Sequence, residues 1–105
     1  MFIIEKTNHF DKWFKKLKDV RAKAKIAVLF KKIEIGNLGD HKSIGDGLSE
    51  FRIAYGPGYR IYYRKKGNII ILLLNGGDKN SQERDIARAK EIWKEIEANN
   101  ENQSK

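Results

Sequence analysis

Hydrophobic and polar residues alternate on both sides of a Gly56-Pro57-Gly58 loop, in the stretch LSEFRIAYGPGYRIYY from Leu48 to Tyr63. This alternation predicts a β-hairpin. With a three-residue loop, the apolar side chains share one face as the pairs Tyr55–Tyr59, Ile53–Ile61 and Phe51–Tyr63. The opposite face then carries the pairs Ala54–Arg60, Arg52–Tyr62 and Glu50–Arg64. Arginines from both strands therefore gather on one face, which suits a phosphate backbone but also an ordinary solvated surface.

Elsewhere the spacing of apolar residues predicts three helices and two more strands. Residues 2–4 and 69–75 are expected to be strands. Helical spacing begins after Thr7 or Asn8, again at Asp19, and again at Asn80, which forms a capping box with Glu83. The glycine-rich passage 36–47 has the composition of a mobile loop. The run Ile69 to Asn75 is apolar on both faces, which indicates an interior strand or an exposed flank for a partner.

These elements predict an α+β fold with the order βααβββα. The sheet is expected to be small and antiparallel-rich, with two N-terminal helices and one C-terminal helix. Residues 1–98 form a single domain in this interpretation, and residues 99–105 a disordered tail.

The charge of the chain favours an anionic partner. Lys and Arg number 22 against 14 for Asp and Glu, which gives a net charge of +8. Nucleic acid, an acidic protein and a lipid surface all fit that charge. The excess is concentrated before residue 80, because residues 81–105 hold five basic and six acidic side chains.

Several kinds of chemistry are excluded or made improbable by composition. Cysteine is absent, so disulfides and thiolate chemistry are excluded. The two histidines, His9 and His41, are far apart and lack an acidic cluster at ligand spacing, so no metal or other cofactor is expected. The longest apolar run, residues 69–74, is too short to span a bilayer, and no signal-like segment precedes Glu5. A cytoplasmic protein without membrane contact is predicted.

Four segments in order resemble the RelE/ParE superfamily of bacterial toxins, especially the addiction-module killer proteins. They are LSEFRI (48–53), GYRIYY (58–63), LLLNGGDK (72–79) and QERDIARA (82–89). The resemblance implies the toxin of a type II toxin-antitoxin module, neutralised by a cognate antitoxin. RelE-like members cleave mRNA in the ribosomal A site, and ParE-like members poison DNA gyrase.

The resemblance implies a catalytic role for Arg52, Arg60 and Lys79. Arg52 matches the basic residue that opens the hairpin in RelE-like enzymes, and Arg60 matches the arginine of their Gly-Tyr-Arg motif. Lys79 matches the basic residue after the final strand. A further basic position falls on Ala54, and an aromatic position near the last helix falls on Ile86 or a neighbour.

Metal-independent RNA cleavage needs donors around one phosphate, which the two arginines and Lys79 supply. Further RNA contacts are expected from Tyr62, Arg64, Lys42, His41, Lys15 and Lys16. Tyr62 would stack a base or pack over Arg52, and His41 is either an acid–base group or a surface residue. Glu50 is expected to pair with Arg64.

Three functions follow as alternatives. The preferred one is a ribosome-dependent mRNA endoribonuclease that contacts mRNA and ribosomal RNA. The others are a gyrase inhibitor without nuclease activity and a non-catalytic RNA-binding module. The antitoxin is expected over the basic sheet face or over an apolar flank at Ile69, Ile71 and Leu73.

Overall fold

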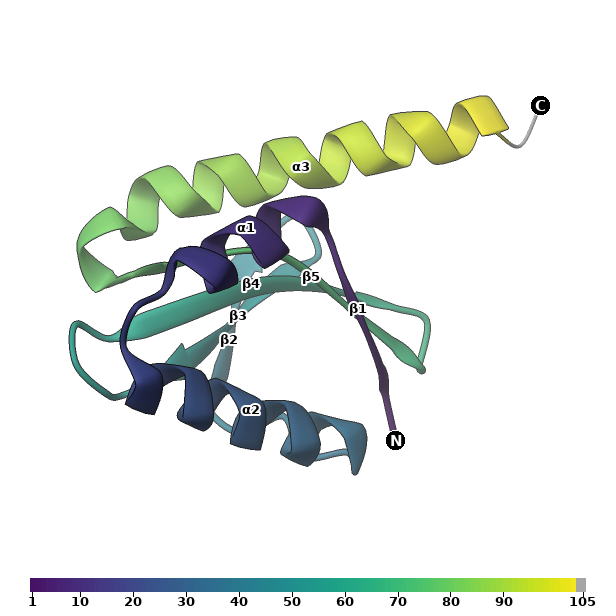
Figure 1. Ribbon diagram of the computed structural model, residues 1–105. Coiled ribbons are helices and arrows are strands. Elements are labelled where there is room, and N and C mark those ends of the chain that lie inside the picture. The colour runs from purple at the N-terminus through teal and green to yellow at the C-terminus, as the bar shows by residue number, and fades with distance from the viewer. Residues whose placement is uncertain (104–105) are drawn as a thin grey trace.

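The computed structural model describes residues 1–103 and has the predicted α+β fold, with a sheet between two layers of helix (Figure 1). The elements are β1 (Ile3–Lys6), α1 (Asn8–Lys16), α2 (Val20–Glu34), β2 (His41–Gly45), β3 (Leu48–Ile53), β4 (Tyr59–Lys66), β5 (Ile70–Asp78), the 3-10 turn η1 (Lys79–Ser81) and α3 (Gln82–Gln103). None of the helices in this range is both long and apolar enough to cross a membrane.

The sheet has five strands in the order β1-β5-β4-β3-β2. The three neighbouring pairs from β2 to β5 are antiparallel, and only β1 runs parallel to its neighbour β5. Strand β2 lies inside the passage that was predicted to be a mobile loop, and that prediction is wrong for residues 41–45. Its sequence HKSIG has no apolar alternation because it is an exposed edge strand, held by pairing with β3.

The register of the β3–β4 hairpin differs from the prediction by two residues. Ile53 lies opposite Tyr59, and Arg52 lies opposite Arg60. The strands end earlier than predicted because the Tyr55 amide donates to the Ile53 carbonyl at 2.9 Å, which turns the chain out of the sheet. Tyr55 instead extends toward α2, where its hydroxyl lies 3.3 Å from Asp19 Oδ1. The corrected register places the two arginines side by side.

Each face of the sheet carries its own apolar cluster. Helices α1 and α2 cover one face, where Phe10 and Ile26 pack against Phe51, Ile61 and other strand residues. Helix α3 covers the other face through Ala89 and Ile92. In Figure 1, α3 and α2 accordingly lie on opposite sides of the strands. The faces alternate along β3 and β4, so Glu50, Arg52 and Arg60 belong to the α3 face.

Strand β5 is an interior strand, as the apolar run allowed. Ile71 and Leu73 are fully buried, and only Ile69, which precedes the strand, is exposed at 57%. The apolar flank expected to receive an antitoxin is therefore closed, because β1 and α1 already cover it. Gly76 and Gly77 belong to β5 and are buried.

Both ends of α3 differ from the prediction. Asp78 caps the preceding turn in a capping box with Ser81, in place of the predicted Asn80 and Glu83. The helix is assigned to Gln103 and so includes residues 99–103 of the segment that was predicted to be a tail. Residues 104–105 of that predicted tail lie outside the described residues.

Tyr62 carries a buried hydroxyl with no hydrogen-bond partner among the described residues. Burial, and then the nearby charge of Glu50, raise the pKa of Tyr62 far above its ordinary value. We expect Tyr62→Phe to stabilise the protein by about 1 kcal/mol, because it removes an unpaired polar atom. Urea unfolding at pH 7 measures the difference, and a loss of stability would contradict it.

The same substitution should change the response to alkali. The folded state resists deprotonation of Tyr62, so ionisation of this group has no effect on stability well below pH 10 and progressively favours the unfolded state above pH about 10. Wild-type stability should therefore fall faster than that of Tyr62→Phe as the pH rises above about 10.

Candidate functional site

A basic hollow lies on the α3 face, where the N-terminal end of α3 stops short of covering β2 and β3. It has a volume of about 380 Å³ and is lined by Lys42, Ser43, Ile44, Glu50, Arg52, Arg60, Gln82 and Ile86. Arg52 and Arg60 are cross-strand partners, so their side chains leave the sheet next to each other. Both arginine side chains therefore line the same open hollow.

Arg52 is held at the outer side of the hollow by Asp40. Its Nη2 and Nε lie 2.9 and 3.3 Å from Asp40 Oδ1, and the Arg52 amide donates to the Asp40 carbonyl at 2.9 Å. The side chains are 36% and 56% exposed. An ion pair in that much water contributes little to stability, so Arg52 can exchange Asp40 for another anion.

Arg60 is more enclosed, with its side chain 14% exposed. Its Nη1 donates to the carbonyls of Gly58 and Tyr59, each at 3.3 Å. Its Nε lies 3.7 Å from Glu50 Oε2. The Arg60 guanidinium is therefore anchored on two sides, which limits the loss of side-chain entropy when it binds a ligand.

Glu50 forms the floor of the hollow and is 1% exposed. Gln82 Nε2 donates to its two oxygens at 3.1 and 3.5 Å. The predicted Glu50–Arg64 pair is wrong, because Glu50 lies opposite Tyr62 in the actual register. The carboxylate faces Arg60 and Gln82 instead.

Two lysines flank this centre. Lys42 is exposed on β2, opposite Glu50, and lines the hollow. Lys79 follows β5 and is exposed. A Cβ atom built on Gly58 would lie 3.5 Å from Arg60 Nη1 and 3.6 Å from Lys79 Cβ, so Arg60 and Lys79 border the same glycine. Of the three predicted catalytic residues, Arg52 and Arg60 meet in the hollow, and Lys79 stands beside Arg60.

Tyr62 and Arg64, two of the predicted RNA contacts, both make contacts within the fold. Tyr62 is fully buried under α3, so its ring cannot stack on a base, and that prediction is wrong. Arg64 lies over the Trp93 ring, 4.6 Å from its centroid, and its Nη1 donates to the Asp46 carbonyl at 3.1 Å. Arg64 thus links the β2–β3 turn to α3 through its contacts with Asp46 and Trp93.

Three other predicted contacts lie away from the hollow. His41 pairs with Phe51, which belongs to the opposite face, and its exposed ring has Nδ1 3.0 Å from the Gly39 carbonyl. Lys15 and Lys16 are exposed on α1, the helix that packs on that same opposite face. They therefore lie across the sheet from Arg52 and Arg60.

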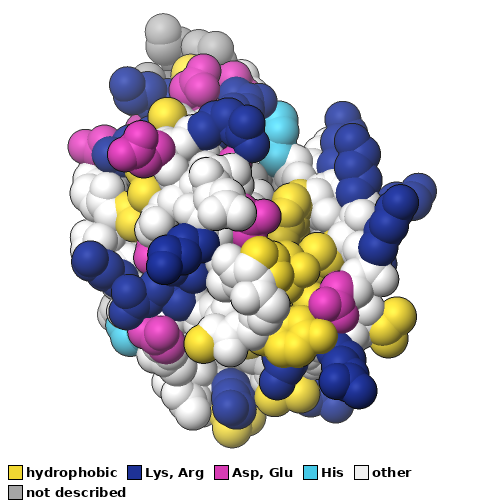
Figure 2. Space-filling model, turned by 90° about the vertical axis from the view of Figure 1, so that its left-hand side faces the viewer, with side chains coloured by type: hydrophobic (Ala, Val, Ile, Leu, Met, Phe, Trp, Pro, Cys, Tyr) yellow, Lys and Arg dark blue, Asp and Glu magenta, His cyan; other side chains and the backbone are white. Residues whose placement is uncertain are grey.

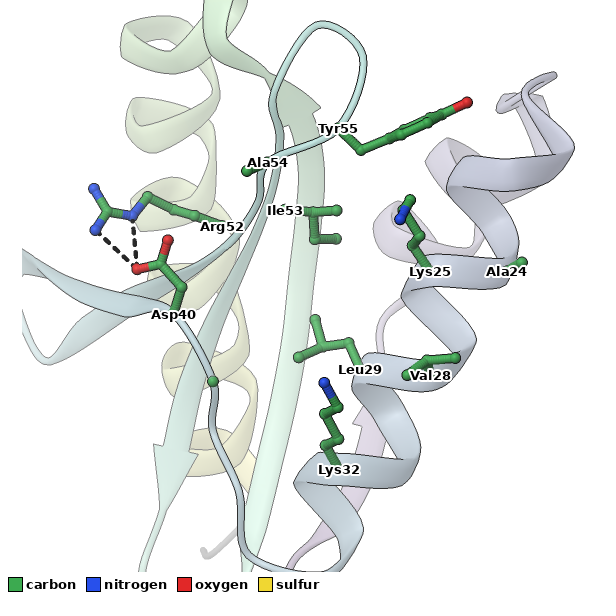
Figure 3. A pocket seen from close by; sticks show the side chains of 11 residues that line it. Ala24, Lys25, Val28, Leu29, Lys32, Asp40, Arg52, Ile53, Ala54 and Tyr55 are labelled. Atoms are coloured by element: carbon green, nitrogen blue, oxygen red, sulfur yellow. Dashed lines mark hydrogen bonds and ion pairs between the residues drawn. The ribbon is translucent and has the colours of Figure 1, made fainter.

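A second depression adjoins the hollow. It has a volume of about 430 Å³ and lies between α2 and the end of β3, and we call it the α2 groove. Figure 3 shows Ile53 and Leu29 turned toward each other across it, with the Arg52–Asp40 pair at one wall and Lys25 and Lys32 on α2. Since Arg52 lines both depressions, they share a wall.

Sequence reasoning missed Asp40 and Gln82, and it gave Glu50 the wrong partner. Asp40 lay in a passage interpreted as loop, and Gln82 is separated from Glu50 by 32 positions. The alternation did place Glu50 on the arginine face, and the correct register would have placed it beside Arg60.

The described residues contain no group of three His, Asp or Glu side chains that could hold a metal ion. Ile86, which with its neighbours was the expected place of an aromatic residue, lines the hollow together with Ile44.

Comparison with known proteins places the chain beside one bacterial relative. No family model matches the chain. A protein of Haemophilus influenzae strain Rd, described as an uncharacterized protein, is 46% identical over 93 residues, which cover 89% of this chain and 94% of the relative. With that identity over nearly the full length of both proteins, the chain belongs to the same family as this Haemophilus influenzae protein.

Proposed function

We propose that this protein is the toxin of a type II toxin-antitoxin module and cleaves mRNA on the ribosome. The observation that carries the proposal is the cross-strand pair Arg52–Arg60, whose guanidinium groups share one open hollow. The resemblance to RelE-like toxins supports the same residues. The cytoplasm, where ribosomes lie, is the proposed compartment.

The reaction assigned to the hollow is an internal phosphoryl transfer. The 2′-oxygen of a ribose attacks the adjacent phosphorus, a P–O2′ bond forms, and the P–O5′ bond breaks. The 2′-hydroxyl gives up its proton to a base, and the leaving O5′ receives one from an acid. The products are a 2′,3′-cyclic phosphate and a 5′-hydroxyl end.

The residues of the hollow divide these tasks by position. Arg60 and Arg52 hydrogen-bond the non-bridging oxygens, whose negative charge grows in the transition state. Lys79, beside Arg60, neutralises the phosphate or protonates the leaving oxygen. Lys42 reaches the next phosphate along the strand from β2. Lys15 and Lys16 contact ribosomal RNA from the other side of the sheet.

The cognate antitoxin is proposed to lay an amphipathic, acidic segment in the α2 groove. The groove offers apolar contacts at Leu29, Ile53 and Val28, of which Val28 is 53% exposed. Lys25, Lys32 and Arg52 supply positive charge, and Asp40 is the only acidic lining residue. On the face of the molecule drawn in Figure 2, Lys and Arg side chains surround a contiguous hydrophobic patch that also has acidic side chains at its border. Carboxylates of the partner would compete with RNA for Arg52.

Mapping of cuts on a defined mRNA tests the proposed nuclease activity. The purified protein is added to ribosomes programmed with that mRNA, and the same mRNA without ribosomes is the comparison. Primer extension should show cuts only with ribosomes. Intact mRNA together with gyrase-linked DNA breaks would replace this proposal with the gyrase inhibitor. Intact mRNA, intact DNA and harmless overexpression would leave the RNA-binding module.

A further inference from the structure

Two polar side chains, the buried Glu50 and the half-buried Gln82, lie in a row behind Arg60. Glu50 is 1% exposed and stands between Arg60 Nε, at 3.7 Å, and Gln82 Nε2, at 3.1 Å. Taking a carboxylate out of water costs several kcal/mol unless its partners compensate. Buried ionisable groups of this kind concentrate at functional sites, where they arrange other charges. A charged residue that serves only solubility is exposed to water, so solubility does not explain the buried carboxylate of Glu50.

The contacts of Arg60 leave one edge of its guanidinium free. Nη1 donates to the carbonyls of Gly58 and Tyr59, whereas Nε is buried and has no hydrogen-bond partner among residues 1–103. Its contact with Glu50 Oε2, at 3.7 Å, is an ion pair and not a hydrogen bond. No hydrogen bond of Nη2 occurs among residues 1–103. Because the guanidinium is a rigid plane, contacts at two of its nitrogens fix the direction of the third. The direction of the Nη2 donors is therefore fixed before a ligand binds.

We propose that Glu50 is a positioning residue, held by Gln82, that fixes Arg60 so that its free Nη2 edge binds the phosphate of the RNA substrate. This inference rests on the proposed function of the hollow. Charge alone predicts the opposite effect of Glu50, because removing a negative charge makes the hollow more positive and strengthens anion binding. The sign of the effect thus separates positioning from simple electrostatics.

Titration of the free protein with inorganic phosphate tests the inference. The probe is the NMR signal of the Arg60 Nε–H group, assigned with Arg60→Lys. Glu50→Gln removes the charge and keeps the shape, whereas Gln82→Ala removes the donor and keeps the charge. We expect a saturable shift in the wild type and about fivefold weaker phosphate binding in both variants, the effect of one hydrogen bond. Thermal unfolding checks that each variant is folded. If Glu50→Gln does not fold, the phosphate affinity of Gln82→Ala alone tests the positioning role.

Phosphate binding that is unchanged or tighter in the folded variants would overturn the positioning role. A wild type without a saturable shift at Arg60 would overturn the anion site. A different set of results would contradict the proposed nuclease function while keeping the positioning role. In that case phosphate binds and both variants weaken it, but ribosome-bound mRNA stays intact. Conversely, mRNA cleavage with variants that behave like the wild type would retain the nuclease and discard the positioning role.

Discussion

Arg60→Ala should reduce mRNA cleavage on programmed ribosomes by about 100-fold or more, because it removes the enclosed donor that stabilises charge on the phosphate. Arg60 is the more important of the two arginines because it is 14% exposed and anchored on two sides, whereas Arg52 is 36% exposed and paired with Asp40. A donor fixed in a poorly solvated position contributes more to transition-state stabilisation than a mobile one. Arg52→Ala should also lower cleavage and toxicity, by a smaller factor.

Controls must separate lost chemistry from lost folding. Arg60→Ala leaves Glu50 without its basic partner, so circular dichroism and thermal unfolding are needed for that variant. Arg84→Ala is a matched control, because it removes an exposed arginine just beyond the hollow. It should cleave like the wild type. Undiminished killing by both Arg52→Ala and Arg60→Ala would remove these residues from the active site.

Gly76→Ala should destabilise the fold by about 3 kcal/mol, the upper range for an overpacked core. A Cβ atom on Gly76 would lie 2.4 to 2.6 Å from three ring atoms of Trp13. The indole cannot move aside easily, since Phe10 and Tyr59 pack on it with centroid distances of 5.8 and 6.3 Å. For a domain of this size, the midpoint of thermal unfolding should fall by roughly 10–20 °C.

A double variant identifies the cause. In the background of Trp13→Leu, the smaller side chain leaves room for the new methyl group, so Gly76→Ala should cost less than about 1 kcal/mol. Gly67→Ala is the comparison for backbone strain alone, because it has φ +59° and no heavy atom within 4 Å of the new Cβ. It should cost about 1–2 kcal/mol. Equal costs of Gly76→Ala in both backgrounds would show that Trp13 is not the obstacle.

The elements with strong periodicity could be predicted from sequence. The two faces of the hairpin, the helix that begins after Asp19 and the apolar strand predicted at 69–75 all carry patterns set by burial, and the structure contains them, with the strand continuing to Asp78. The gathering of Arg52 and Arg60 on one face followed from the same alternation. Periodicity of two fixes the face of a side chain, whatever the partner strand.

The parts that could not be predicted depend on contacts between distant segments. The hairpin register is set by Tyr55 leaving the sheet for Asp19, which is 36 positions away. Strand β2 exists because β3 offers it an edge, and its own residues carry no strand pattern. The burial of Tyr62 follows from the placement of α3 across β4, which alternation along β4 does not reveal.

The parallel pairing of β1 with β5 has a consequence for synthesis. Ile3 is paired with Ile70, so the first strand leaves the ribosome long before its only neighbour in the sheet exists. In the nascent chain, β1 therefore has no strand to pair with until β5 has been translated. Gln82 and Ile86, which line the hollow, are translated after β5. An enzyme of this architecture that attacks translating ribosomes would remain inactive until residues 82–86 of its own chain have been translated and folded.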